Sequence, residues 1–214
     1  MGRNSGGVID ITGGTGGSGG SGAKVNVVTT AVSKSRSIDT IKDRSVVREL
    51  FRGISRFESV MGIRERSVRI ANLDGMNALG VTWINRADGK STGILLNERF
   101  FDRKKNVIEA DVKKNHYDSG FKNRTNAPVQ HTITHELAHA TWNASMQSTK
   151  AKAAGKEITE LYRTWRKDKK KNGYGKYGET NVSEFWSEAV TKAIHGTADK
   201  YTRKVKAIAK KYQL

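Results

Sequence analysis

The chain has no cysteine, one proline and no long apolar run, and each absence excludes something. Without cysteine, the 214 residues form no disulfide framework and offer no thiolate to a metal ion. No apolar segment is long enough for a signal peptide or a membrane-spanning helix, so we expect no membrane contact. Acidic residues are also scarce, because 21 Asp and Glu stand against 39 Lys and Arg, for a formal net charge of +18.

Glycine and positive charge are concentrated in particular segments. Residues 1–22 hold ten of the 22 glycines. Such a segment buries too little apolar surface to offset its ordering entropy, so we predict a flexible tail followed by one domain over residues 23–214. Basic residues gather at 150–176 and in a predicted final helix at 200–214. This basic surface is either an ordinary solvated surface or a contact for nucleic acid or another polyanion.

The most informative pattern is H-E-x-x-H, formed by His135, Glu136 and His139. On a helix, residues i and i+4 lie on one face, so both imidazoles can reach one metal ion. Glu136 then projects beside the metal, where a bound water would sit. Two neutral nitrogen ligands, an open position and a nearby carboxylate base are what a zinc hydrolase needs.

The pattern requires a helix, and the flanking residues predict one. Pro128, the only proline, follows the preferred cap residue Asn126 and costs nothing in a first helical turn. We therefore predict a helix from about Ala127 to about Ser145. The alternative is a buried helix whose histidines form only local hydrogen bonds.

Catalytic zinc usually takes three protein ligands, so a third must lie elsewhere. A second helix is predicted to begin near Asn181, and it places Glu184 and Glu188 one turn apart beside an apolar stripe. Either Glu184 is the third ligand or it pairs with Asn181 in a capping box.

The other histidines are assigned lesser roles. His131 lies one turn before His135 on the same face, and we expect it in the outer shell or facing solvent. We expect a local hydrogen bond for His195 and a loop position for His116.

Together these segments resemble the zincin-like metalloproteases of the anthrax lethal-factor type. That family has H-E-x-x-H followed some 40 residues later by Y-x(6)-E-F-F-A-E-A, and this chain has Tyr177 and then Glu184-Phe-Trp-Ser-Glu188-Ala. Related domains occur in phage head-associated proteins and bacterial toxins. The resemblance covers about 100 residues, roughly Val81 to Gly196.

The resemblance implies a role for each motif residue. His135, His139 and Glu184 would bind Zn²⁺, and Glu136 would be the general base. Glu188 would support the site from the outer shell. Tyr177 would stabilise the oxyanion or protonate the leaving group, although by its surroundings alone it is a loop aromatic among glycines.

The predicted fold class is α+β, with a zincin-like domain built on a small mixed sheet. A helix is predicted at 37–61, and strands are predicted at 24–32, 67–73, 78–85 and 91–97, the last two joined by an Asp-Gly hairpin turn at 86–89. By resemblance, residues 93–97 form an edge strand that binds extended substrate. The alternative is a hairpin that merely covers the core.

Two function classes follow. The first is a zinc endopeptidase that acts on a protein or peptide substrate. The second is a basic structural or nucleic-acid-associated protein, for example of a phage virion, on a zincin scaffold with little or no protease activity. A peptidoglycan-acting enzyme is weaker because no cell-wall-binding repeat is present. Retention of Glu136 favours the first class, because a structural zinc site has no use for a free base. The expected location is the cytoplasm or a phage particle.

Overall fold

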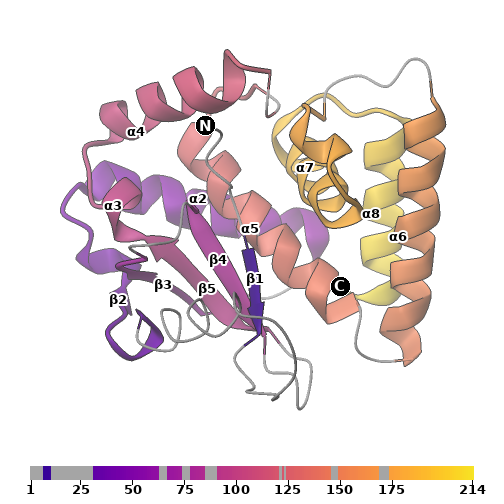
Figure 1. The fold of residues 1–214 in the computed structure, drawn as a ribbon, viewed down its shortest axis with the longest axis horizontal. Coiled ribbons are helices and arrows are strands. Elements are labelled where there is room, and N and C mark those ends of the chain that lie inside the picture. The colour runs from indigo at the N-terminus through magenta and orange to yellow at the C-terminus, as the bar shows by residue number, and fades with distance from the viewer. Residues whose placement is uncertain are drawn as a thin grey trace, which may run out of the picture.

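The computed structural model describes residues 7–10, 31–62, 67–73, 78–84, 91–120, 122, 124–145, 149–168 and 174–214. Within these ranges the chain is an α+β fold, in which helices pack against a mixed sheet (Figure 1). Three predictions lie outside the described residues: most of the Gly-rich tail, the strand from Lys24 up to residue 30, and the Asp-Gly turn at 86–89.

The sheet contains five described strands in the order β1-β4-β5-β3-β2. Their bounds are Gly7–Asp10 (β1), Arg36–Ser37 (β2), Val68–Ala71 (β3), Gly80–Ile84 (β4) and Ser91–Asn97 (β5). Strands β4 and β5 pair antiparallel, as the hairpin pattern predicts, whereas β3 pairs parallel to β5 and β1 pairs parallel to β4.

The prediction of a substrate-binding edge strand at 93–97 is wrong. Strand β5 has β4 on one side and β3 on the other, so its backbone groups are already paired. Ile94, Leu95 and Leu96 are all fully buried, as expected of a central strand that is covered on both faces.

The outer edge of β4 is taken by β1, which lies inside the predicted flexible tail. Gly7–Asp10 pairs in register with residues 81–84, so the tail prediction is wrong for these four residues. Val8 and Ile9 are β-branched and favour extended backbone, which the glycine content of the surrounding segment obscures.

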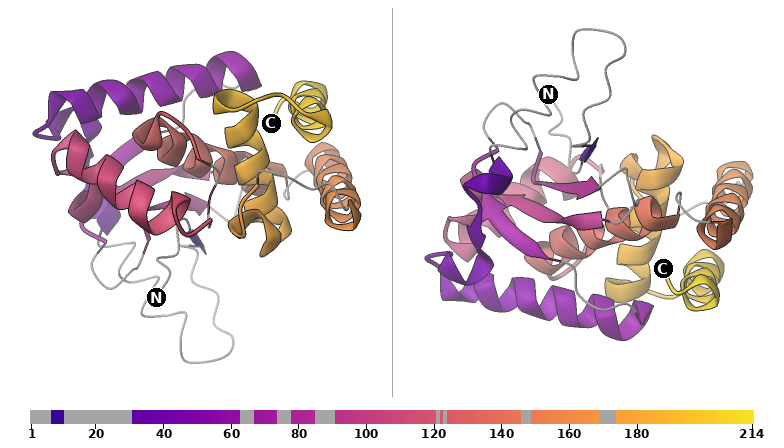
Figure 2. Two further views of the ribbon diagram at one scale, coloured as in Figure 1. Left: turned by 90° about the horizontal axis from the view of Figure 1, so that it is seen from above. Right: turned by 90° about the horizontal axis from the view of Figure 1, so that it is seen from below.

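Helices supply most of the remaining described structure. They are η1 (Ile38–Thr40), α2 (Arg44–Met61), α3 (Glu98–Phe101), α4 (Lys105–Val112), the π-helical turn η2 (Lys113–Tyr117), α5 (Pro128–Ser145), α6 (Thr149–Lys167), η3 (Tyr177–Glu179), α7 (Val182–His195) and α8 (Lys200–Tyr212). Figure 2 shows α6, α7 and α8 gathered at one end of the molecule, beside the sheet. Among the described helices, none has the length and apolarity needed to cross a membrane.

Helix α2 begins later than the sequence pattern predicts. The predicted start at Ser37 is wrong, because Ser37 is in β2 and the side chain of Asp43 caps the helix by accepting from the amide of Ser45. The end at Met61 agrees with the prediction. Helices α5 and α7 also lie where they are predicted, and Pro128 occupies the first position of α5.

Helix α5 is the centre of the fold. All its side chains from Pro128 to Trp142 are buried, and it packs against α2, α7, α6, α4 and strands β4 and β5. A helix buried on every side cannot leave its polar groups in water, so each must find a partner inside the protein.

An aromatic cluster fixes the helices at the far end. Trp165 of α6 and Phe185 of α7 have ring centroids 5.0 Å apart, and Tyr174 lies within 5.6 Å of both. The hydroxyl of Tyr174 donates to Asp199, which caps α8. This cluster holds the chain segment that leads into η3 and α7.

Helices α2 and α5 approach closely at Gly53. A Cβ atom at this position would lie 2.4 Å from Cγ2 of Ile133 and 3.1 Å from Cα of Gln130. Because Ile133 is β-branched and fully buried, it has little freedom to move aside. Glycine is therefore required for the observed helix contact.

We predict that Gly53→Ala destabilises the protein by about 1–2 kcal/mol, because the added methyl group overpacks the contact with α5. Helix propensity alone would give the opposite sign, a gain of up to ~1 kcal/mol. Urea unfolding is the measurement, with Ser55→Ala at an exposed position of α2 as the control. A stabilised Gly53→Ala variant would show that the two helices are not held this closely.

Candidate metal centre

Three acceptor atoms from two helices converge in the protein interior. The Nε2 atoms of His135 and His139 on α5 lie 3.1 Å apart, and each lies 3.2 Å from Oε2 of Glu184 on α7. All three side chains are buried. Ligand atoms about 2.0–2.1 Å from one tetrahedral ion are ~3.3 Å from each other, so this spacing suits a shared metal ion.

The outer nitrogen of each histidine is also engaged. Nδ1 of His135 lies 3.0 Å from Oε1 of Glu188, and Nδ1 of His139 lies 3.0 Å from the hydroxyl of Ser183. A carboxylate only accepts, so we infer that Nδ1 of His135 carries the proton and that its Nε2 presents a lone pair. With His139 oriented likewise, three electron-rich atoms face one another. A single proton would serve one of these contacts at a time, whereas a metal ion would satisfy all three.

The side chain of Glu184 lies beside the two histidines and not over the first turn of α7. The side chain of Asn181 accepts from the amide of Glu184 at 3.0 Å and so caps α7, as the capping pattern predicts. The Glu184 carboxylate instead reaches the two histidines. Burial raises its pKa, but His139 and His135 outweigh burial and bring the pKa to about 2, so the group is ionised and able to bind a cation.

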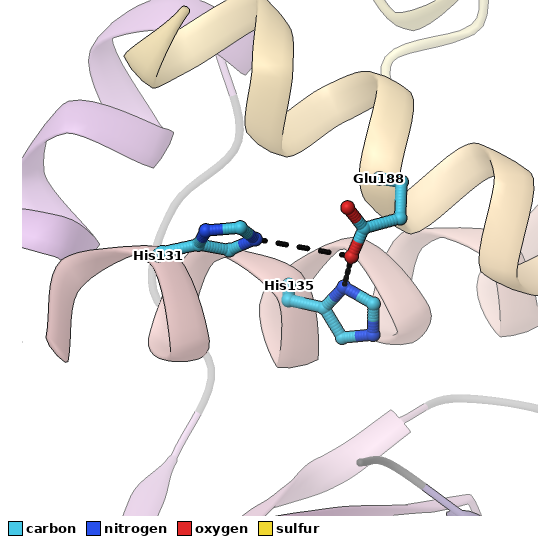
Figure 3. A group of neighbouring side chains, drawn as sticks. All are labelled: His131, His135 and Glu188. Carbon is cyan, nitrogen blue, oxygen red and sulfur yellow. Dashed lines mark ion pairs between the residues drawn. The ribbon is translucent and has the colours of Figure 1, made fainter. Parts of the chain in front are cut away.

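Glu188 lies one turn further along α7 and is completely buried (Figure 3). Its Oε1 lies 3.0 Å from Nδ1 of His135 and 3.8 Å from Nε2 of His131. Burial raises the pKa of Glu188, but the two histidines outweigh burial and hold the pKa well below its usual range. A carboxylate behind a metal-binding histidine fixes the orientation of its ring.

His131, His135 and Glu188 also form a group that could hold a metal ion. The two groups share His135, whose nitrogens point to opposite sides. Because the contact from His131 to Glu188 is longer than any distance among His135, His139 and Glu184, these three residues are the better candidate for a metal site, and we call them the metal group.

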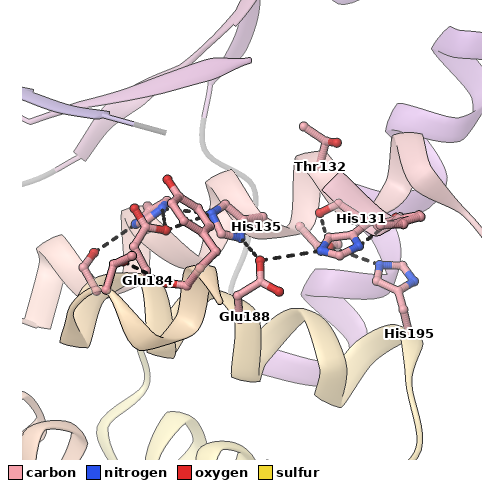
Figure 4. Close-up of polar contacts among 12 residues, drawn as sticks. His131, Thr132, His135, Glu184, Glu188 and His195 are labelled. Carbon is pink, nitrogen blue, oxygen red and sulfur yellow. Dashed lines mark hydrogen bonds and ion pairs between the residues drawn. The ribbon is translucent and has the colours of Figure 1, made fainter. Parts of the chain in front are cut away.

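His131 is buried and does not face solvent. It is 1% exposed, and its Nδ1 lies 2.9 Å from the hydroxyl of Tyr117 at the end of η2. Figure 4 shows His131, Glu188, His135 and Glu184 in one continuous line of polar contacts. His195 makes the expected local hydrogen bond, with Nε2 3.1 Å from the hydroxyl of Thr134.

Glu136 is fully buried beside the metal group, and neither of its carboxylate oxygens has a hydrogen-bond partner among the described residues. Strand β4 leaves room for its side chain, because a Cβ atom on Gly80 would lie 3.2 Å from Cγ of Glu136. A buried carboxylate without a donor costs free energy, which a bound water or ligand would offset.

Tyr177 lies against the metal group and is not a peripheral loop aromatic. Its ring stacks on the ring of His135 at a centroid distance of 5.6 Å, and the residue is 5% exposed. The short helix η3, which follows the aromatic cluster, holds it in this position.

Two residues near the site escaped the sequence patterns. His116 is buried in the π-helical turn η2, so the prediction of a loop is wrong. Lys122 is 5% exposed, and its ammonium lies 5.3 Å from the centre of the Tyr177 ring. Both lie in a polar run without hydrophobic periodicity, which gave no signal of burial.

Comparison with known proteins gave no match: no protein-family model, no curated protein and no solved structure is significantly similar to this chain. The functional argument therefore rests on the geometry of the site and on the motif residues.

We predict one metal ion per chain, with different losses in two variants. Glu188→Gln should weaken metal affinity by about 10–100-fold, because it removes only the group that orients His135. Glu184→Gln should cause a larger loss, because it removes a ligand. Competition with a chromogenic chelator measures both, with Glu179→Gln as a control. If Glu188→Gln abolishes binding while Glu184→Gln has no effect, the ion lies in the other group.

Proposed function

We propose that the chain is a zinc-dependent endopeptidase of the zincin type, in which Glu136 is the general base. The observation that carries this proposal is the convergence of three buried acceptor atoms beside a buried carboxylate that has no partner among the described residues. Two imidazoles and one carboxylate are a common ligand set of catalytic zinc. Zinc bound there would lower the pKa of a coordinated water and polarise the scissile carbonyl.

Glu136 would hold and move the proton. Its carboxylate oxygens accept no hydrogen bond from the described residues, so they are available to accept the proton of an attacking water. The same carboxylate can then deliver that proton to the leaving amine. Because the surroundings exclude solvent, the electrostatic effect of the carboxylate is stronger than it would be in water.

Tyr177 would supply a donor for the oxyanion. Stacking on His135 restricts the phenol ring to a position beside a ligand of the metal group. A hydroxyl held in place in this way needs little reorganisation when negative charge develops on the carbonyl oxygen.

The outer shell would keep the ligands in the geometry that the reaction needs. Glu188 would orient His135. His131 contacts the same Glu188 oxygen and is itself held by the hydroxyl of Tyr117. Supporting contacts of this kind limit small displacements of the ligands, which would otherwise slow the reaction.

We predict that Glu136→Gln keeps the metal and loses peptide cleavage, because an amide cannot accept the proton of water. Metal content and cleavage of a mixed peptide library are measured on the same preparation. Glu160→Gln on the exposed face of α6 is the control. Cleavage that persists in Glu136→Gln would exclude Glu136 as the base, and metal without cleavage in the unaltered chain would contradict the proposed function.

Tyr177→Phe should leave metal affinity unchanged and lower kcat by on the order of 10²-fold, the cost of removing one oxyanion donor. The ring and its stacking on His135 are retained, so the change isolates the hydroxyl. Tyr212→Phe on α8 serves as the matched control. Unchanged kinetics would show that the hydroxyl takes no part.

The second candidate function is binding of nucleic acid, which the distribution of positive charge favours. Arg44, Arg48, Arg52 and Arg56 follow one another at four-residue spacing along α2, and all four are exposed. Like charges one turn apart destabilise a helix, so the row has a cost that a polyanion would remove. Helix α8 packs against α2, and α6 packs against α8; both carry further exposed lysines and arginines.

If this surface binds duplex DNA, affinity falls as salt rises, and Arg48→Gln with Arg56→Gln lowers the slope of log K against log salt by about 2. Fluorescence anisotropy of a labelled duplex is the measurement. The control replaces Arg103 and Arg124, which already pair with Asp111 and Asp118. Equal slopes in all three proteins would exclude α2 as the contact.

A further inference from the structure

Lys122 is a buried cation for which the described structure provides no anion. It is 5% exposed, and its ammonium has no hydrogen-bond acceptor among the described residues. The ammonium lies 5.3 Å from the centre of the Tyr177 ring. A cation–π contact offsets only part of the cost of removing an ammonium from water.

The backbone fixes Lys122 beside the metal group. Gly120 has a φ of +67°, which turns the chain after η2, and the amide of Lys122 donates to the carbonyl of His116 at 2.9 Å. The amide of Lys176 donates to the carbonyl of Gly120 at 3.1 Å. These bonds join the segment that carries Lys122 to the residue just before Tyr177.

The charge of Lys122 acts on the histidines around it. Burial and then Lys122 lower the pKa of His116 to about 3. The ammonium lies 5.3 Å from the centre of the Tyr177 ring, and this ring in turn lies 5.6 Å from the ring of His135. Lys122 is therefore separated from the metal group by one aromatic ring.

We propose that Lys122 is the anion-binding residue of this site and pairs with a carboxylate of the bound substrate, carried by an acidic side chain or by a chain terminus. The inference rests on the proposed peptidase function. Lys122 and Glu136 are opposite charges, both buried and both without a hydrogen-bond partner in the described residues. A peptide carboxylate at Lys122 would give the ammonium an acceptor, and the attacking water would give Glu136 a donor.

Glu136, Glu184 and Lys122 are all buried. A peptide can therefore reach the metal ligands or Lys122 only when the residues that cover them move. The alternative is that Lys122 only fills space against Tyr177. In that case methionine, which has a similar length and no charge, would serve equally well.

The test measures peptide binding in the zinc-loaded Glu136→Gln protein, with and without Lys122→Met. Three matched peptides are compared: one with a glutamate, one with glutamine in its place, and one with an amidated C-terminus. We expect Lys122→Met to weaken binding of the peptides that carry the bound carboxylate by about tenfold or more, as for loss of a charge-assisted hydrogen bond. The peptide that lacks this carboxylate should change less than twofold, and it identifies which carboxylate Lys122 binds.

A second measurement needs neither cleavage nor a peptide. Lys122→Met should raise the melting temperature, because it removes a buried charge that has no partner. Glutarate, as a simple carboxylate probe, should raise the melting temperature of the zinc-loaded unaltered chain and not that of Lys122→Met. Lys176→Met is the matched control, since Lys176 is exposed on the same segment and its loss changes the net charge equally.

The outcomes separate this inference from the proposed function. A lower melting temperature for Lys122→Met, together with equal losses for all three peptides, would overturn the inference. Selective loss of carboxylate binding in a protein that never cleaves peptides would support the anion site and contradict the peptidase. Lys122→Arg, which keeps the charge, should retain part of the selectivity.

Discussion

The fold depends on one constraint, which is that α5 is buried on every side and yet is rich in polar residues. Four neighbouring elements supply hydrogen-bond partners to its polar side chains or backbone. Helix α2 supplies Glu49 to Gln130, η2 supplies Tyr117 to His131, and α7 supplies His195 to Thr134 and Trp186 to Thr141. Strand β4 supplies Thr82, whose hydroxyl donates to the carbonyl of Glu136. Because unpaired buried polar groups are costly, these pairs specify how α5 sits among its neighbours.

Around the metal group the pairing is left incomplete. The inner nitrogens of His135 and His139 and one oxygen of Glu184 face one another, and Glu136 and Lys122 have no hydrogen-bond partner among the described residues. We propose that ligands account for these groups, which links the proposed catalysis to the proposed anion site.

The sheet contributes in an indirect way. Strand β4 supports α5 through Thr82 and leaves space for Glu136 at Gly80, while its outer edge is paired with β1. An extended peptide that paired with β4 would have to replace β1. Residues 7–10 are therefore part of the surroundings of the site.

Local chemistry in the sequence determined the two site helices and their register. Pro128 and Asn181 mark where α5 and α7 begin, and the four-residue spacing of His135 and His139 places both on one face, because these signals act within a few residues. The position of the Glu184 carboxylate beside the two histidines was decided only by tertiary structure, which brings α7 against α5. The same holds for the central position of β5, the pairing of β1 and the burial of His116 and Lys122. These features depend on contacts between distant segments, and periodicity within one segment carries no information about them.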